Sequence, residues 1–117
     1  MSLRRPLTRG DLVLIQFPLT DLSAHKLRPA LIVGRVSGDD VVLAFISSCM
    51  SSTDPSAEHA FEPTDGEFTM TGLKVQSLIW LNKLATLHRA LVRRRPGQIG
   101  PATQRAVASG LRYVFEI

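Results

Sequence analysis

Short apolar runs separated by polar connectors dominate the first half of the chain. Three runs are rich in Val, Ile and Leu and are bounded by Gly, Pro, Asp or Ser, which is typical of β-strands: residues 11–18 (DLVLIQFP), 29–36 (PALIVGRV) and 41–48 (VVLAFISS). Residues 38–40 (GDD) are a tight-turn signal between the last two runs and predict an antiparallel hairpin. The polar stretch 18–27 predicts a loop after the first strand.

Strand-like runs continue through the second half of the chain. Residues 49–60 are small and polar and predict a connecting loop, and a short edge strand is expected at 61–63. The remaining strand candidates are 75–81, 83–87 and 88–97. The second of these either extends the first or follows a kink near Asn82.

The period of the pattern changes near the C-terminus. Residues 101–114 begin with a proline, which fits the first position of a helix, and Val107, Leu111 and Val114 recur at four- and three-residue steps. This spacing predicts an amphipathic helix, in which Gly110 is either a weak point or a close-packing contact. Several short strands followed by one helix predict a mainly β fold, a small, strongly bent and mostly antiparallel barrel or sheet.

Length and composition bound this picture without changing it. The chain has 117 residues, of which 44% are hydrophobic and 21% charged, so residues 1–117 are expected to form a single domain around a modest core. A domain of this size buries a limited share of its surface, which makes pairing with a second copy a natural source of further stability.

Charge and cysteine usage narrow the expected class of protein. Fourteen Lys and Arg against ten Asp and Glu give a net charge of +4, which is compatible with a polyanionic partner such as RNA. Cys49 is the single cysteine, so there is no internal disulfide, and a reducing cytoplasm is expected. The three histidines and Cys49 have no metal-ligand spacing, and no run is long enough to cross a membrane. We therefore expect a soluble cytoplasmic protein without a metal or cofactor.

The first candidate for chemistry is Arg28, which stands immediately before Pro29 at the start of a predicted strand. The proline biases the arginine backbone toward an extended conformation, and the guanidinium fork matches a phosphate. Ser47 and Ser48 end the neighbouring strand of the predicted hairpin, where their hydroxyls can bind a phosphate or ribose near Arg28. The alternative interpretation, favoured by the residue pattern alone, is a solvated arginine and two polar residues that end a strand.

Three further residues carry weaker signals. His25 lies in the predicted loop 18–27, where its imidazole can act as an acid or base near neutral pH, or have no catalytic task. Trp80 is the only tryptophan and is either a platform for a nucleobase or a core or dimer contact. Arg93 opens the dense positive run 93–95, which either follows a phosphate backbone or is a solvated strand end.

The order of these segments resembles the MazF/PemK family of bacterial toxins. The matching stretches are RGDLVLIQFPLTD (9–21), KLRPALIVG (26–34), VLAFISS (42–48) and NKLATLHRALVRRRPGQI (82–99), followed by the predicted helix. The resemblance implies a compact SH3-like or CcdB-like antiparallel barrel with a C-terminal helix, assembled as a homodimer. It also implies the toxin component of a type II toxin–antitoxin system: a sequence-selective, metal-independent endoribonuclease that cuts single-stranded RNA and is blocked by a cognate antitoxin.

The same resemblance implies roles for individual residues. Cleavage of this kind uses the 2′-hydroxyl of the RNA as nucleophile, so the enzyme must stabilise a pentacoordinate phosphorane. Arg28 matches the arginine of the family's Arg-Pro pair, and Ser47 falls where the family usually carries threonine. Trp80 and Asn82 stand where many relatives carry an arginine and an aspartate. An asparagine cannot take up a proton, so either His25 is the base, or Arg28 and Ser47 suffice, or cleavage is feeble.

These arguments predict a catalytic set and an RNA-binding set. The catalytic set is Arg28, Ser47 and His25, and the RNA-binding set is Ser48, Trp80, Asn82, Lys26 and Arg93. Two alternatives stay open. A CcdB-like toxin would bind DNA gyrase through the C-terminal helix and have no nuclease activity, and a degenerate relative would bind RNA without cutting it.

Overall fold

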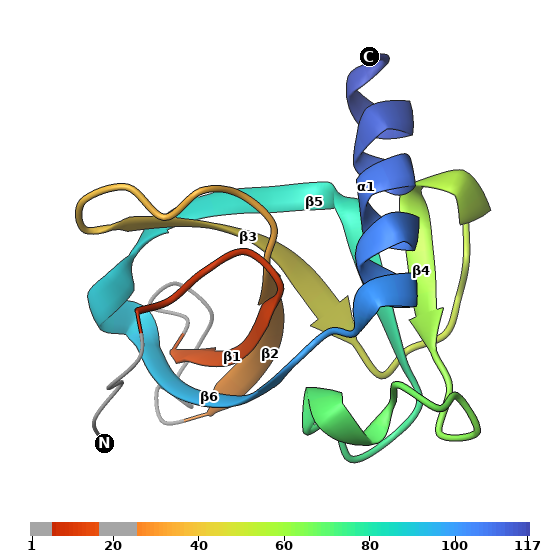
Figure 1. The fold of residues 1–117 in the computed structure, drawn as a ribbon, viewed down its shortest axis with the longest axis horizontal. Helices are drawn as coiled ribbons and strands as arrows, with labels where there is room; N and C mark the ends of the chain where they lie inside the picture. The colour runs from red at the N-terminus through yellow and green to blue at the C-terminus, as the bar shows by residue number, and fades with distance from the viewer. Residues whose placement is uncertain (1–5, 17–25) are drawn as a thin grey trace.

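The computed structural model describes residues 6–16 and 26–117. In this part of the chain six strands and three short 3₁₀ turns precede one C-terminal α-helix (Figure 1). The strands are β1 (Asp11–Gln16), β2 (Leu27–Ile32), β3 (Asp40–Ser47), β4 (Glu58–Phe61), β5 (Ser77–His88) and β6 (Val92–Gln98). The turns are η1 (Pro55–Ala57), η2 (Thr69–Thr71) and η3 (Arg89–Leu91), and the helix is α1 (Pro101–Phe115). The predicted mainly β fold with a C-terminal helix is confirmed.

The strands form one antiparallel sheet in the order β4-β5-β3-β2-β1-β6. The predicted hairpin is present, since β2 pairs with β3 through Leu31 opposite Ala44, and Gly38 takes a left-handed φ of 59° in the turn between them. The expected bent, antiparallel barrel-like sheet is present but is not closed in the described residues, because β4 and β6 remain separate edges. The segment 62–76, which carries η2, packs against β6 where a closing strand would pair.

Both faces of the curved sheet are apolar, which explains why the strands appear in the sequence as nearly continuous apolar runs. Neighbouring residues of one strand enter different clusters, as Leu12 and Val13 do in β1. One cluster is covered by α1 and comprises Leu12, Leu31, Val33, Ala44, Ile46, Phe61, Ile79, Leu81, Ile99 and Val107. The other comprises Leu7, Val13, Ile15, Ala30, Ile32, Val41, Leu43 and Val92.

Strand β5 is long and irregular in the middle. Phe45 pairs with Trp80, but the adjacent Ala44 pairs with Leu84, so residues 81–83 bulge out of the ladder. Of the two alternatives for residues 83–87, the structure shows that they extend the same strand, with the irregularity near Asn82. The bulge turns Leu81 into the core, where a Cβ atom on Gly110 of α1 would overlap its Cδ1 atom. Gly110 is thus a close-packing contact.

Two boundaries differ from the sequence prediction. Residues 58–61 form β4, although this stretch was assigned mainly to a connecting loop and the edge strand was expected at 61–63. Only Phe61 of β4 is fully buried, so the apolar pattern carries little signal, and the strand depends on pairing with β5. Strand β2 begins before Pro29, which makes Arg28 a residue of the strand opposite Ile15.

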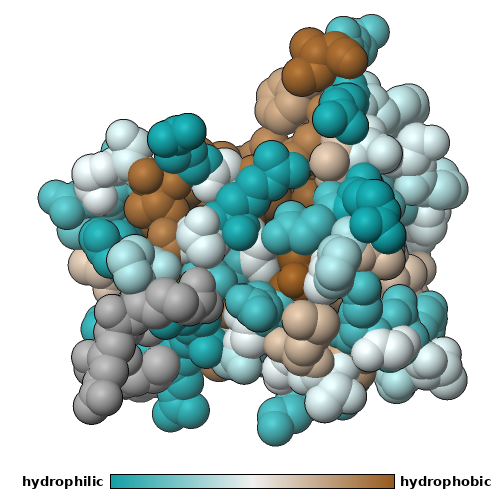
Figure 2. All heavy atoms as spheres, viewed as in Figure 1, coloured by the Kyte–Doolittle hydropathy of each residue, from teal (hydrophilic) through white to brown (hydrophobic). Residues whose placement is uncertain are grey.

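The free end of α1 extends beyond the sheet (Figure 1). Apolar side chains lie exposed there, since Phe115 is 56% and Ile117 is 86% exposed, and Figure 2 shows a hydrophobic cluster at this protruding end. The opposite end of the helix is held against the sheet and against segment 62–76.

Segment 62–76 lies in direct backbone contact with β6. A Cβ atom on Gly97 would overlap the backbone of Met70 and Thr71. Thr71 is 1% exposed; its hydroxyl donates to the Phe68 carbonyl at 2.6 Å and accepts from the Leu73 N–H at 3.1 Å. These contacts leave no room for a side chain at position 97 and fix the path of the segment.

We predict that Gly97→Ala destabilises the protein by about 1–3 kcal/mol, because the added methyl meets backbone that cannot rotate away. Chemical denaturation measures the change. Gly66→Ala in the same segment is the matched control, since no atom lies within 4 Å of its Cβ position, and it should change stability by less than about 0.5 kcal/mol. Equal effects of the two substitutions would contradict the close-contact argument.

Candidate functional site

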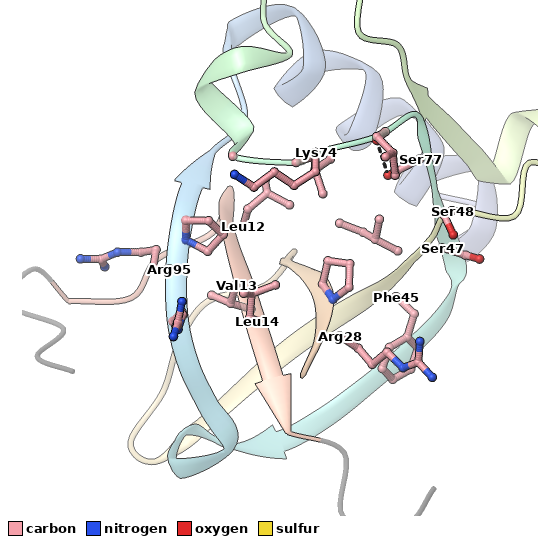
Figure 3. Close-up of a pocket in the computed structure, with 17 residues that line it drawn as sticks. Leu12, Val13, Leu14, Arg28, Phe45, Ser47, Ser48, Lys74, Ser77 and Arg95 are labelled. Atoms are coloured by element: carbon pink, nitrogen blue, oxygen red, sulfur yellow. Dashed lines mark hydrogen bonds between the residues drawn. The ribbon is translucent and has the colours of Figure 1, made fainter. Parts of the chain in front are cut away.

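A hollow of about 870 Å³ opens on the sheet between β3 and β6 (Figure 3). Apolar side chains that line it include Leu12, Leu14, Pro29, Ile46, Leu73 and Pro96. The polar and charged lining residues are Arg28, Ser47, Ser48, Lys74, Ser77, Arg94 and Arg95. Apolar surface combined with several cations suits an anionic ligand that also has apolar surface.

The end of the β2–β3 ladder creates this hollow. The paired residues stop at Ala30 and Phe45, although β2 extends back to Leu27 and β3 continues to Ser47. Continuing the register by two residues would place Arg28 opposite Ser47. Because the ladder ends, the two strands present these side chains to open space, and both residues line the hollow.

Arg28 is exposed and projects beside Phe45 at one end of the hollow (Figure 3). Its guanidinium forms no ion pair or side-chain hydrogen bond with any described residue. A permanently charged group without an internal partner keeps all of its donors available to a ligand. The structure therefore brings Arg28, Ser47 and Ser48 together, as the sequence predicted.

Ser47 is oriented by the backbone that follows it. Its Oγ accepts a hydrogen bond from the Cys49 N–H at 3.0 Å. Because the oxygen is engaged as an acceptor, the hydroxyl proton is left to be donated to a group in the hollow.

Two more cations share the hollow with Arg28. Lys74, in the connection between η2 and β5, and Arg94, in β6, are both exposed, and neither has an ion pair or side-chain hydrogen bond within the described part of the chain. Arg95 differs, since its Nη1 lies 3.5 Å from the buried Asp11 carboxylate. Among residues 6–16 and 26–117, no aspartate or glutamate lines this hollow. The charge of the site is therefore positive.

The sequence prediction missed Lys74, Arg94 and Arg95. The run 93–95 was treated as one unit represented by Arg93, but the structure separates its members. Arg93 does not line the hollow, and its Nε and Nη2 donate to Gln16 Oε1 at 3.0 and 2.7 Å. Because successive side chains of a strand point to opposite faces, the sequence contained a signal that adjacent arginines would differ. The sequence around Lys74 contained no signal that this lysine would line the hollow.

The other predicted RNA-binding residues lie around or outside the hollow. Trp80 is the cross-strand partner of Phe45, and Phe45 lines the hollow. Lys83 Nζ lies 3.9 Å from the centroid of the Trp80 ring. Asn82 lies in the β5 bulge and lines a separate hollow of about 650 Å³ beside the end of α1, because the bulge removes it from the regular strand. Lys26 is exposed and precedes β2. His25 and most of the predicted loop 18–27 lie outside the described residues.

Glu67 anchors the segment that carries Lys74. Its carboxylate accepts hydrogen bonds from the Ala102 N–H (3.1 Å), the Thr103 N–H (3.1 Å) and the Thr103 hydroxyl (3.0 Å). The N-cap residue of α1 is Gly100, which has no side chain, so Glu67 caps the helix from a distant part of the chain. These hydrogen bonds lower the pKa of Glu67, and the largest effects come from the two backbone amides.

We predict that Glu67→Gln lowers the melting temperature at pH 7. Since the pKa of Glu67 is lowered in the folded state, its ionised form contributes stability above the ordinary glutamate range, and this contribution is lost as the pH falls through the folded pKa. The difference between wild type and variant should therefore narrow below a pH of roughly 4. Thermal unfolding between pH 3 and pH 7 measures it.

The control for this experiment is Glu116→Gln, which removes a carboxylate at the other end of α1. It should not reproduce the loss at pH 7. A Glu67→Gln deficit of equal size at pH 3 and pH 7 would contradict a cap that depends on the ionised carboxylate.

A family model for the PemK-like, MazF-like toxin of type II toxin–antitoxin systems matches residues 8–115. The chain belongs to this family. The match covers every described strand and all of α1, and it confirms the resemblance to MazF/PemK toxins. A comparison with curated protein sequences found no significant match.

Solved structures share the fold of this toxin. An endoribonuclease in complex with its cognate antitoxin from Mycobacterial species is 19% identical with a TM-score of 0.69, over 96% of this chain and 97% of that chain. An endoribonuclease from Mycobacterial species is 18% identical with a TM-score of 0.70, over 99% and 97% of the two chains. The Mycobacterium tuberculosis toxin MazF-mt6 is 18% identical with a TM-score of 0.71, over 92% and 97%. Within the described residues of this toxin, no helix is both long and apolar enough to cross a membrane.

Proposed function

We propose that this toxin is a metal-independent endoribonuclease that cuts single-stranded RNA, in particular mRNA, at the hollow that contains Arg28 and Ser47. The observation that carries the proposal is that a guanidinium without a partner among the described residues and a serine hydroxyl line the same hollow, together with other cations and no described carboxylate. Proteins with the same fold are described as endoribonucleases, which supports the same activity here.

The proposed reaction is an internal phosphoryl transfer. The 2′-oxygen of one nucleotide forms a bond to the adjacent phosphorus and loses its proton. The bond from phosphorus to the 5′-oxygen of the next nucleotide then breaks, and this oxygen takes up a proton. The products are a 2′,3′-cyclic phosphate and a 5′-hydroxyl end.

Arg28 is suited to the charge that develops during this transfer. The phosphorane carries more negative charge than the starting diester, and a fixed cation in a partly apolar hollow stabilises that increase. Ser47 can donate its free proton to a non-bridging oxygen, because its oxygen is already engaged by the Cys49 N–H. His25 is one alternative for the base that takes the 2′-hydroxyl proton; the other is that Arg28 and Ser47 suffice.

One expected RNA contact, Asn82, lies away from the hollow that contains Arg28. Asn82 lies in a separate hollow, so the missing carboxylate at this position removes no group from the site around Arg28. The degenerate RNA-binding alternative thereby loses its main support. The family match and the described neighbours favour the nuclease over the gyrase-binding alternative.

The proposal includes partners and a compartment. A neighbour with the same fold is bound to its cognate antitoxin, and an acidic, partly apolar antitoxin segment complements the cationic hollow of this toxin. A homodimer would cover apolar surface such as the exposed Phe115 and Ile117. The cytoplasm is the proposed location, since mRNA is found there.

We predict that Arg28→Ala reduces RNA cutting by at least about 100-fold, because one donor to a developing oxyanion is worth roughly that much. The assay incubates purified protein with a long single-stranded RNA in EDTA and maps new 5′ ends, which should be hydroxyls. The melting temperature should stay unchanged, because the side chain is exposed and unpaired. The control is Arg35→Ala, which also removes one positive charge but lies beyond the other end of β2; this variant should cut RNA normally.

Undiminished cutting by Arg28→Ala would remove the centre of this mechanism. A wild-type protein that neither cuts nor binds RNA would reject the proposed function as a whole.

We predict that Ser47→Ala lowers the cutting rate by roughly 10- to 100-fold, the value of one hydrogen bond to a charged oxygen. Ser47→Thr keeps the hydroxyl and adds a methyl group that restricts its rotamer, so it should cut at least as fast as wild type. Single-turnover rates on one RNA compare the three proteins. Equal losses in both variants would indicate that shape, and not the hydroxyl, matters at this position.

A further inference from the structure

We propose that Lys74 and Arg94 form a second phosphate-binding site in the hollow, which we call the Lys74–Arg94 subsite. It would hold an RNA phosphate next along the strand from the one bound by Arg28. This inference rests on the proposed function, because it takes single-stranded RNA as the ligand.

Arg28 and Arg94 both line the hollow, and the strand register places β1 between the strands that carry them. Leu14 of β1 is opposite Pro29 on one side and opposite Arg94 on the other. Leu14, Pro29 and Arg94 therefore follow one another across three strands, with register shifts in the β1–β6 ladder on both sides of Leu14. Arg28 is the neighbour of Pro29 in β2 and is paired with Ile15. Neighbouring strands lie about 4.8 Å apart, which separates the backbones of Pro29 and Arg94 by roughly 10 Å. Arg28 and Arg94 thus rise from different walls and are suited to different phosphates.

Lys74 reaches the hollow from a different part of the chain. Figure 3 shows it on the side away from Arg28, extending from the connection that follows η2. Lys74 and Arg94 therefore converge on one hollow, although twenty positions separate them in sequence.

The positive charges of Lys74 and Arg94 are not used in ion pairs or side-chain hydrogen bonds within the described part of the chain. Arg95 is held by Asp11 and Arg93 by Gln16, whereas Lys74 and Arg94 have no side-chain partner in the described part of the chain. Gathering unpaired cations with Arg28 in one hollow disfavours the folded chain through repulsion. An anionic polymer that meets all three relieves that repulsion, and no described carboxylate lines the hollow to do so.

The backbone that presents Lys74 is fixed before any ligand arrives. Gly72 takes a left-handed φ of 77°, and a Cβ atom there would lie 2.7 Å from the Pro96 Cβ. Thr71 is buried against β6, and Glu67 ties the same segment to the start of α1. A fixed backbone with an exposed, charged side chain reduces the ordering cost of binding.

The test measures binding of a random-sequence pool of 2′-O-methyl single-stranded RNA, which keeps its phosphates but cannot be cut. Fluorescence anisotropy at several salt concentrations gives the affinity and its salt dependence. Lys74→Gln and Arg94→Gln should each weaken binding roughly fivefold to tenfold. Each should also reduce the slope of log K against log salt by about 0.7, the value for one phosphate contact on a single strand.

Controls separate this role from charge and from folding. Arg35→Gln removes one positive charge elsewhere and should keep the wild-type slope. Lys74→Arg keeps the charge and should keep both affinity and slope. In the cutting assay with ordinary RNA, Lys74→Gln and Arg94→Gln should raise KM and leave kcat close to wild type.

Other results would overturn either the Lys74–Arg94 subsite or the proposed function. Wild-type affinity and slope in Lys74→Gln and Arg94→Gln, with normal cutting, would overturn the subsite and leave the proposed function intact. A loss in Lys74→Arg equal to that in Lys74→Gln, or a loss confined to kcat, would also overturn it. Failure of the wild type both to bind and to cut RNA would reject the proposed function and the subsite together.

Discussion

The close backbone contact between Gly97 of β6 and residues 70–71 determines how this sheet ends. Because segment 62–76 occupies the side of β6, that strand pairs only with β1 and the sheet stays open in the described part of the chain. The same contact makes the segment a wall of the 870 Å³ hollow. The absence of a side chain at Gly97 thus permits the contact that shapes both the sheet edge and the hollow.

Glu67 extends this constraint to the helix. Its carboxylate binds the first amides of α1, whose own cap residue, Gly100, has no side chain to do so. Gly110 then brings the middle of α1 against Leu81 of the β5 bulge. Segment, helix and sheet are therefore joined through polar and apolar contacts that lie next to the site but outside it.

The arginines near the hollow illustrate how tertiary contacts divide chemically identical residues. Arg93 is engaged by Gln16 and Arg95 by Asp11, so both serve the architecture. Arg94 lies between them in sequence and has no described side-chain partner, as is also true of Arg28. A cation that is already paired contributes little to a ligand, because its field and its donors are used. Arg28 and Arg94, which have no side-chain partner among the described residues, are the ones to which we assign the proposed binding of phosphate charge.

The apolar pattern by itself determined most of the fold. Strands β1, β2 and β3, the hairpin at Gly38 and the start of α1 follow from local periodicity and turn chemistry, which act over a few residues. The expectation that Arg28 and Ser47 lie near each other follows in the same way, since the hairpin register places them at the same end of neighbouring strands, and both line the hollow. Strand β4 and the open edge depend on distant partners, so the sequence alone misplaced the edge strand and left open whether the bent sheet closes. Likewise, only the tertiary structure separated Arg93, Arg94 and Arg95, moved Asn82 out of the site and brought in Lys74. Local patterns encode which residues are buried, but whether a charge is paired or free depends on contacts between segments far apart in the chain.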